Sequence, residues 1–192
     1  MVQYFKPGDN QSMIDFTKAL QELVVKHSEK KEEIVLLCIG SDRATGDCLG
    51  PIIGHKLYPY QSHGHTKNFH IYGTLEKPIH AKNLEATLQM IQLYHTNALV
   101  IAIDASLGIV EHIGYVTLGE GSLSPGIGVA KSLPAVGDIF ITGIVNLSGF
   151  GSQMLLQTTH LNLVMKLADF ITMGLYRSVI RSELRPALQR AE

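Results

Sequence analysis

The sequence has little cysteine and almost no net charge. Its 192 residues include two cysteines, Cys38 and Cys48, whose spacing matches neither a zinc site nor a thioredoxin motif. We therefore expect two free thiols and a reducing compartment. The 16 basic and 17 acidic residues leave a formal charge of −1, so neither nucleic acid nor an anionic membrane is an expected partner.

Long hydrophobic runs are also missing. No apolar stretch reaches the roughly 18 residues expected of a membrane-spanning helix, and residues 1–10 lack the apolar segment of a signal peptide. The chain is nevertheless 45% hydrophobic and 17% charged, which is enough apolar material for a folded core. Together with the length, these properties predict one cytoplasmic domain spanning residues 1–192.

The chain does contain short apolar runs that alternate with helical patterns. Such runs, bounded by turn residues, are typical of buried parallel strands. Strands are predicted over residues 34–39 (IVLLCI), 69–75 and 98–103 (ALVIAI). Helices are predicted over residues 10–29, 47–58 and 83–95. This alternation predicts an α/β fold, a three-layer α/β/α sandwich around a mostly parallel sheet.

The pattern changes in the second half of the chain. Residues 112–118 mix polar and apolar side chains and are expected to form a short edge strand. A loop is predicted over residues 119–136, and a further strand over residues 138–145. Residues 152–181 carry apolar side chains at helical spacing, which predicts one long helix.

Two aspartates occupy the positions where chemistry is expected in such a fold. Asp47 opens the helix after the first apolar strand and its loop, and Asp104 directly follows the third. Ligands bind beyond the carboxyl ends of parallel strands, so both carboxylates should share one crevice, within roughly 4–8 Å. Such a pair shares one proton and can activate water, or it binds a divalent metal. The local pattern also allows ordinary roles, a helix N-cap for Asp47 and a turn residue for Asp104.

Other motifs narrow the kind of site. The loop from Gly40 to Gly46 lacks the Gly-Lys-Ser/Thr of a phosphate-binding loop, and no nucleophile elbow surrounds any serine. His63 and His65 could chelate a metal, but their polar neighbours favour an exposed loop. The residues expected to line a peptide cleft are Gly40, Ser41, Asp42, Arg43, Thr45 and Ser106.

Three segments carry a resemblance to a known superfamily. Residues 38–51 (CIGSDRATGDCLGP) resemble the first signature of the spore germination proteases, where a glycine-rich loop leads to an aspartate followed by a small residue, Leu, Gly and Pro. Residues 100–105 (VIAIDA) are similar to their second signature, and residues 124–129 (SPGIGV) to a later Pro-Gly-x-Gly-Val stretch. The resemblance spans residues 34–150 and is shared by the YyaC group of sporulation proteins.

The resemblance implies both a fold and an activity. The fold would be the phosphorylase/hydrolase-like type that hydrogenase-maturation peptidases share. The activity would be peptide-bond hydrolysis in sporulation or germination, without a cofactor, with Asp47 and Asp104 as the catalytic residues. The partner would be a spore protein or peptide in the forespore or mother cell.

Two alternatives stay open. In the first, Asp47 and Asp104 hold a divalent metal, as the corresponding acids of the maturation peptidases do. Those enzymes add a histidine ligand, for which His112 is the nearest candidate in this chain. In the second, the domain is not catalytic and binds a spore protein or peptide on the same fold.

Overall fold

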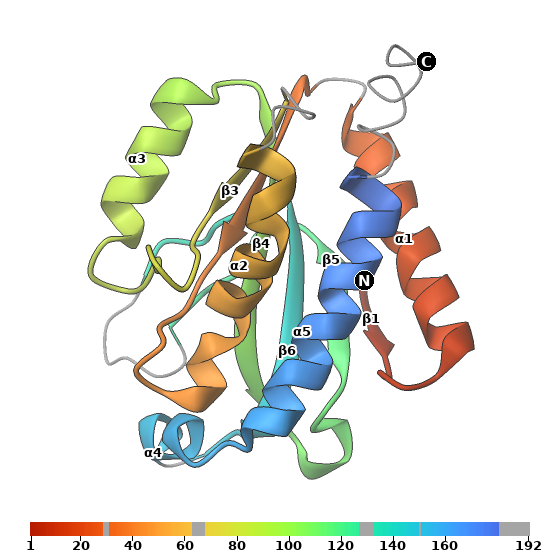
Figure 1. Ribbon diagram of the computed structural model, residues 1–192, viewed down its shortest axis with the longest axis vertical. Helices are drawn as coiled ribbons and strands as arrows, with labels where there is room; N and C mark the ends of the chain where they lie inside the picture. Colours follow the sequence, from red (N-terminus) through yellow and green to blue (C-terminus); the bar gives the residue numbers. More distant parts are fainter. Residues whose placement is uncertain (29–30, 63–67, 127–132, 150, 181–192) are drawn as a thin grey trace.

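The fold is a six-stranded sheet with helices on both faces (Figure 1). The computed structural model describes residues 1–28, 31–62, 68–126, 133–149 and 151–180. The strands are β1 (Val2–Phe5), β2 (Glu33–Cys38), β3 (Phe69–Tyr72), β4 (Ala98–Gly108), β5 (Val116–Glu120) and β6 (Ile139–Leu147). The helices are α1 (Asn10–Ser28), α2 (Leu49–Ser62), α3 (Leu84–Tyr94), α4 (Ser152–Gln157) and α5 (Leu161–Leu175). Short turns of 3-10 helix cover Thr45–Cys48 and Val110–His112, and a π-helical turn covers Tyr176–Ile180. The predicted α/β class is confirmed.

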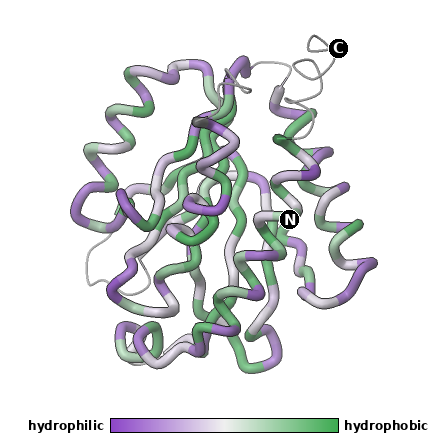
Figure 2. The backbone as a smooth tube through the Cα atoms, viewed as in Figure 1, coloured by the Kyte–Doolittle hydropathy of each residue, from purple (hydrophilic) through white to green (hydrophobic). Residues whose placement is uncertain are grey.

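The apolar strands are buried on both faces, which explains their continuous hydrophobic runs. In β2, Leu36 and Cys38 pack into a core with α1, α2 and α5, whereas Val35 and Leu37 pack into a second core beneath α3. Figure 2 shows this arrangement: the central strands are mostly green (hydrophobic), whereas green and purple (hydrophilic) segments alternate along the helices. None of the described helices is both long and apolar enough to cross a bilayer.

The order of the strands in the sheet is β1-β5-β6-β4-β2-β3. From β2 the chain first adds β3 on one side of this strand and then adds β4 on the other side. β2 pairs in parallel with β3 on one side and with β4 on the other, and β4 pairs in parallel with β6. The connection from β2 to β3 runs through α2 on one face, and the return to β4 runs through α3 on the other. Ligand sites in open α/β sheets form at such a switch point, beyond the carboxyl ends of the two central strands.

One strand is longer than its sequence pattern predicted. The pairing of β4 with β2 ends at Ile103, but β4 continues beside β6, where Asp104 pairs with Thr142, as far as Gly108. The expectation that the strand ends at residue 103 and that Asp104 follows it is therefore wrong. The apolar run stops where β4 loses its neighbour β2 and its face opens to the crevice, although the backbone ladder with β6 continues.

The second half of the chain also departs from expectation. β5 is not at an edge, because β1, which no sequence pattern predicted, pairs with its outer side. The long helix expected over residues 152–181 is divided into α4 and α5. The Thr158 and Thr159 hydroxyls donate to carbonyl groups of the last turn of α4, at Met154 and Leu155, and such bonds favour a helix end.

Helix α2 lies backbone against backbone on the strand ends. A Cβ atom added at Gly50 would overlap the carbonyl oxygen of Ile39, and one added at Gly54 would overlap that of Gly73. These glycines let the first turns of α2 approach the carboxyl ends of β2 and β3 closely. The close approach fixes the turn that precedes α2, which carries Asp47.

Candidate active site

Asp104 lies inside β4, on the face where the sheet opens toward the crevice. The residue is only 6% exposed, and its Oδ1 accepts a hydrogen bond from the backbone N–H of Ala105 at 2.8 Å. Backbone pairing with Thr142 of β6 holds its main chain. The sheet therefore presents a carboxyl group that is buried and fixed in position.

Asp47 approaches from the turn between β2 and α2. Its backbone N–H donates to the carbonyl oxygen of Ala44 at 2.9 Å, and its carbonyl oxygen accepts from the Ser41 N–H at 3.0 Å. Gly40 begins this turn with φ of +141°, and a Cβ there would overlap the Asp47 carbonyl oxygen. Glycine is needed at this position both for the left-handed backbone and for the close contact.

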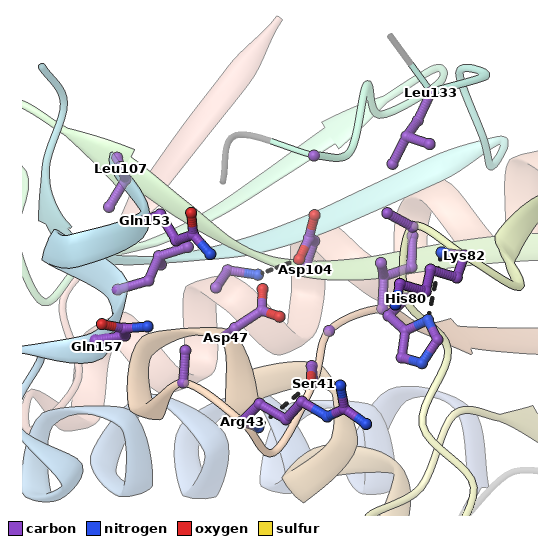
Figure 3. A pocket seen from close by; sticks show the side chains of 17 residues that line it. Ser41, Arg43, Asp47, His80, Lys82, Asp104, Leu107, Leu133, Gln153 and Gln157 are labelled. Atoms are coloured by element: carbon purple, nitrogen blue, oxygen red, sulfur yellow. Dashed lines mark hydrogen bonds between the residues drawn. The ribbon is translucent and has the colours of Figure 1, made fainter. Parts of the chain in front are cut away.

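The structure brings the two aspartates to one cavity of about 310 Å³. In Figure 3 their side chains point toward one another from opposite walls, Asp47 from the turn and Asp104 from β4. The remaining walls come from the segment after β3, from Leu107 and Leu133, and from α4. The side chain of Asn146 at the end of β6 donates to the Leu155 carbonyl oxygen at 2.8 Å, which holds α4 against the sheet.

The two carboxyl groups have unequal proton affinities. Burial raises the pKa of Asp104 well above its ordinary value, the nearby charge of Asp47 raises it further, and the Ala105 N–H partly opposes both. Burial also raises the pKa of Asp47, against the lowering effects of a hydrogen bond from the Ser41 backbone and of His80. Both carboxyl groups therefore hold a proton more readily than a free aspartate does, and the effect is stronger at the more deeply buried Asp104.

The expected cleft residues divide into two sets. Gly40, Ser41 and Arg43 line the cavity, whereas the described lining does not include Asp42, Thr45 or Ser106. The Ser106 hydroxyl lies 3.0 Å from the Thr142 hydroxyl, which lies 2.7 Å from that of Thr117. Ser106 of β4 therefore belongs to a row of hydroxyl groups that also includes residues of β6 and β5. Its hydroxyl contacts Thr142 of β6 and is not part of the cavity lining.

Several lining residues were not predicted from the sequence. His80 and Lys82 follow β3, and Gln153 and Gln157 lie on α4. His80 lies at the crevice because the preceding residue, Ile79, is held there: its carbonyl oxygen accepts a hydrogen bond from the Gly40 N–H at 2.7 Å. Its position just after a strand, at the same sheet edge as the aspartates, was the available signal.

His112 does not supply the histidine that the metal alternative requires. Its ring contacts those of Tyr4 and Tyr115, with centroids 4.6 and 5.7 Å away, and it is absent from the described lining of the cavity. The 3-10 turn and β1 hold it beside the antiparallel part of the sheet. His63 and His65, the other histidines considered, lie outside the described residues.

The cavity does not assemble a three-ligand metal site from described residues. His80 is close enough to lower the pKa of Asp47, but His80, Asp47 and Asp104 do not bring three ligand atoms within 4.8 Å of one another. Zinc and similar ions usually take three or four protein ligands. Among the described residues, the cavity thus offers two carboxylates and no third ligand atom at that distance.

Replacing Asp104 with Asn is expected to stabilise the protein at neutral pH. Below the ordinary carboxyl pKa of 3.8, folded and unfolded chains are both protonated, and the variant gains nothing. As the pH rises, the unfolded chain releases its proton first, so the wild type loses stability until the raised folded pKa is passed. Asn cannot titrate and escapes this loss, which grows by about 1.4 kcal/mol for each unit by which folding raises the carboxyl pKa.

Urea unfolding at about pH 4 and about pH 7 measures this difference. The exposed residue Asp15 provides the matched control, because Asp15→Asn makes the same chemical change outside the core. An Asp104→Asn midpoint that is shifted equally at both pH values would contradict the buried, proton-retaining carboxyl.

The fold and this site define a mixed α/β protein with a buried carboxyl pair at the switch point of its sheet. Residues 4–174 match the family described as "Protein of unknown function (DUF1256)", and the chain belongs to that family. It is 48% identical over 160 residues to "Uncharacterized protein YyaC" of Bacillus subtilis (strain 168), covering 82% of this chain and 76% of that protein. The resemblance to the YyaC group is thereby confirmed.

Proposed function

We propose that this protein is a peptidase that hydrolyses a spore protein or peptide with Asp47 and Asp104. The observation that carries the proposal is the facing pair of carboxyl groups with unequal proton affinities, at the switch point of the sheet. A pair of carboxyl groups, one ionised and one protonated, provides the base and the acid that hydrolysis by water requires.

The two groups would take complementary roles. A water between them attacks the peptide carbonyl carbon, its proton passes to Asp47, and Asp104 gives its proton to the carbonyl oxygen. In the second step the proton on Asp47 passes to the amide nitrogen, the C–N bond breaks, and a hydroxyl of the intermediate returns a proton to Asp104. The pair ends in its starting state, so no cofactor is part of the proposal.

The cavity walls suit a peptide chain. Gln153 and Gln157 supply amide donors and acceptors from α4, and the exposed side chains of Arg43 and Lys82 supply positive charge at the rim. Amide groups pair with peptide N–H and C=O groups, and the cations pair with acidic side chains or a terminal carboxylate.

The fold type and the biological setting belong to the same proposal. The helices on both sheet faces and the signatures in residues 38–51 and 100–105 support a three-layer α/β/α sandwich of the hydrolase-like, maturation-peptidase type. They also support a relationship to spore proteases, and with it a role in sporulation or germination in the cytoplasm of the forespore or mother cell.

Incubation with forespore extract tests the activity. New peptide N-termini, identified by labelling and mass spectrometry, should appear with the wild type and persist in the presence of a chelator. Loss of cleavage on chelation, restored by one divalent ion while the fold stays intact, would favour the metal alternative over the acid pair.

The burial of Asp104 supports a second candidate function. Asp104 is only 6% exposed, and a carboxyl group that a bound peptide cannot reach would leave a cavity that binds the peptide without cutting it. For this non-catalytic alternative, the expected result is capture of a spore protein that is released uncut, with equal retention by Asp47→Asn and Asp104→Asn.

A further inference from the structure

A second group of ionisable side chains lies at the opposite end of the sheet from the aspartate pair. Glu33 begins β2, His70 is the second residue of β3, and His95 follows α3. One ligand atom from each residue lies within 4.8 Å of the others, and all three residues are half-buried. The fold thus gathers two imidazoles and one carboxylate from three separate elements.

One atom in this cluster has no hydrogen-bond partner in the described structure. His70 Nε2 is buried without a hydrogen bond, and the nearest carboxylate oxygen, Glu33 Oε2, lies 3.7 Å away. An unsatisfied buried polar atom is costly, by about 1–3 kcal/mol. Its position beside a carboxylate and a second imidazole suggests a missing ligand rather than a packing defect.

The neighbouring histidine is already oriented for ligation. His95 Nδ1 lies 2.6 Å from Glu33 Oε2, and His95 Nε2 lies 2.8 Å from the Tyr72 hydroxyl. A metal-binding histidine commonly has its second ring nitrogen fixed by such a hydrogen bond, which sets the tautomer and turns the free nitrogen toward the ion. The Tyr72 hydroxyl would accept a hydrogen bond from Nε2–H while Nδ1 faces the site.

A hydrogen bond between Glu33 and His95, without any ion, is the simpler interpretation of this cluster. It accounts for His95 Nδ1 and for one carboxylate oxygen. It leaves His70 Nε2 unsatisfied, although the His70 and His95 rings lie against each other with centroids 4.2 Å apart. A single ion placed among the three side chains would satisfy all of them.

We propose that Glu33, His70 and His95 bind one divalent transition-metal ion of the zinc type, with water as the fourth ligand. Two nitrogens and one carboxylate oxygen suit such an ion and do not suit calcium or magnesium. Tetrahedral ligation at about 2.0–2.1 Å places ligand atoms about 3.3 Å apart. Nδ1 and Oε2 must therefore separate by about 0.7 Å and His70 must approach by about 0.4 Å, which small side-chain rotations allow.

The ion would tie the start of β2 to β3 and to the end of α3. It lies beyond the amino ends of the parallel strands, whereas the aspartate pair lies at their carboxyl ends. The site is therefore independent of the proposed peptidase chemistry, and its expected effect is on the stability of this end of the sheet.

Titration of the chelator-treated protein with zinc, followed by calorimetry, tests the site. The wild type should bind one ion per chain, and cobalt in its place should give the intense visible absorption of a tetrahedral complex. His70→Ala and His95→Gln should each weaken binding at least tenfold, and Tyr72→Phe, which removes only the orienting hydroxyl, should weaken it about tenfold. His112→Ala is the matched control and should bind as the wild type does.

Two further outcomes decide the location of the ion. The double variant Asp47→Asn with Asp104→Asn should keep full zinc affinity, because those residues lie at the other end of the sheet. Loss of the ion in that variant, equal binding by His70→Ala and wild type, or no stoichiometric binding by the wild type would each overturn the proposal. Circular dichroism of each variant separates loss of the site from loss of the fold.

Discussion

Asp47→Asn and Asp104→Asn are each expected to lower the rate of peptide cleavage by about 10²–10⁴-fold. Asn retains the size of the side chain and, at residue 104, an oxygen that accepts the Ala105 N–H bond. It cannot accept or release the proton that moves in each step. The double variant should cleave at about the rate of the slower single variant, because the two groups act as one unit and their effects do not add.

The matched control for this prediction is Asp15→Asn, which makes the same change on the exposed side of α1. Its cleavage rate and thermal midpoint should equal those of the wild type. The measurement is the rate at which new N-termini appear from the spore protein first identified as a substrate. Cleavage by either active-site variant at the wild-type rate would exclude the acid pair as the catalytic group.

Gly54→Ala is expected to destabilise the fold by about 3 kcal/mol. The added Cβ would overlap the carbonyl oxygen of Gly73, a backbone atom that cannot rotate away as a side chain can. Gly73 itself lies against the Cys38 carbonyl oxygen and has a left-handed backbone with φ of +93°, so its carbonyl group has little room to move. Relief of the overlap would require α2 to move away from the sheet, and the turn that carries Asp47 would move with it.

Urea unfolding monitored by circular dichroism measures this effect. Gly149→Ala is the control, since a Cβ there meets no atom within 4 Å and the backbone is not left-handed. The control should change stability by less than about 0.5 kcal/mol. An equally stable Gly54→Ala variant would show that α2 does not lie as close to the strand ends as described.

The parallel half of the fold and the aspartate pair could be predicted from sequence because their signals are local. The run from residue 34 to 39 is apolar throughout, which predicts a strand buried on both faces. Its alternate residues do pack into the two cores on opposite faces of the sheet. Asp47 comes after the run at residues 34–39 and its loop, and Asp104 comes directly after the run at residues 98–103. Because ligands bind at the carboxyl ends of parallel strands, these positions predict that the two aspartates share a crevice.

The missed features depend on partners far away in the chain. β1 has little apolar pattern and is a strand because β5 offers it an edge. The extension of β4 past Asp104 depends on β6, which follows some 40 residues later. His80 reaches the cavity through a backbone contact of Ile79, and the Glu33, His70 and His95 cluster needs the register of β2 with β3 before it can be seen.

The two aspartates are held by different kinds of structure. Asp104 belongs to a strand paired with β6, so it can move only with the sheet. Asp47 belongs to a turn closed by the backbone bonds at Ala44 and Ser41, so a change in the sequence of that turn can reposition it without changing a strand. Insertions, deletions or substitutions within residues 41–46 therefore offer an evolutionary route to change the reach of the pair, and with it the size of the group accommodated between the carboxyls, while the core remains the same.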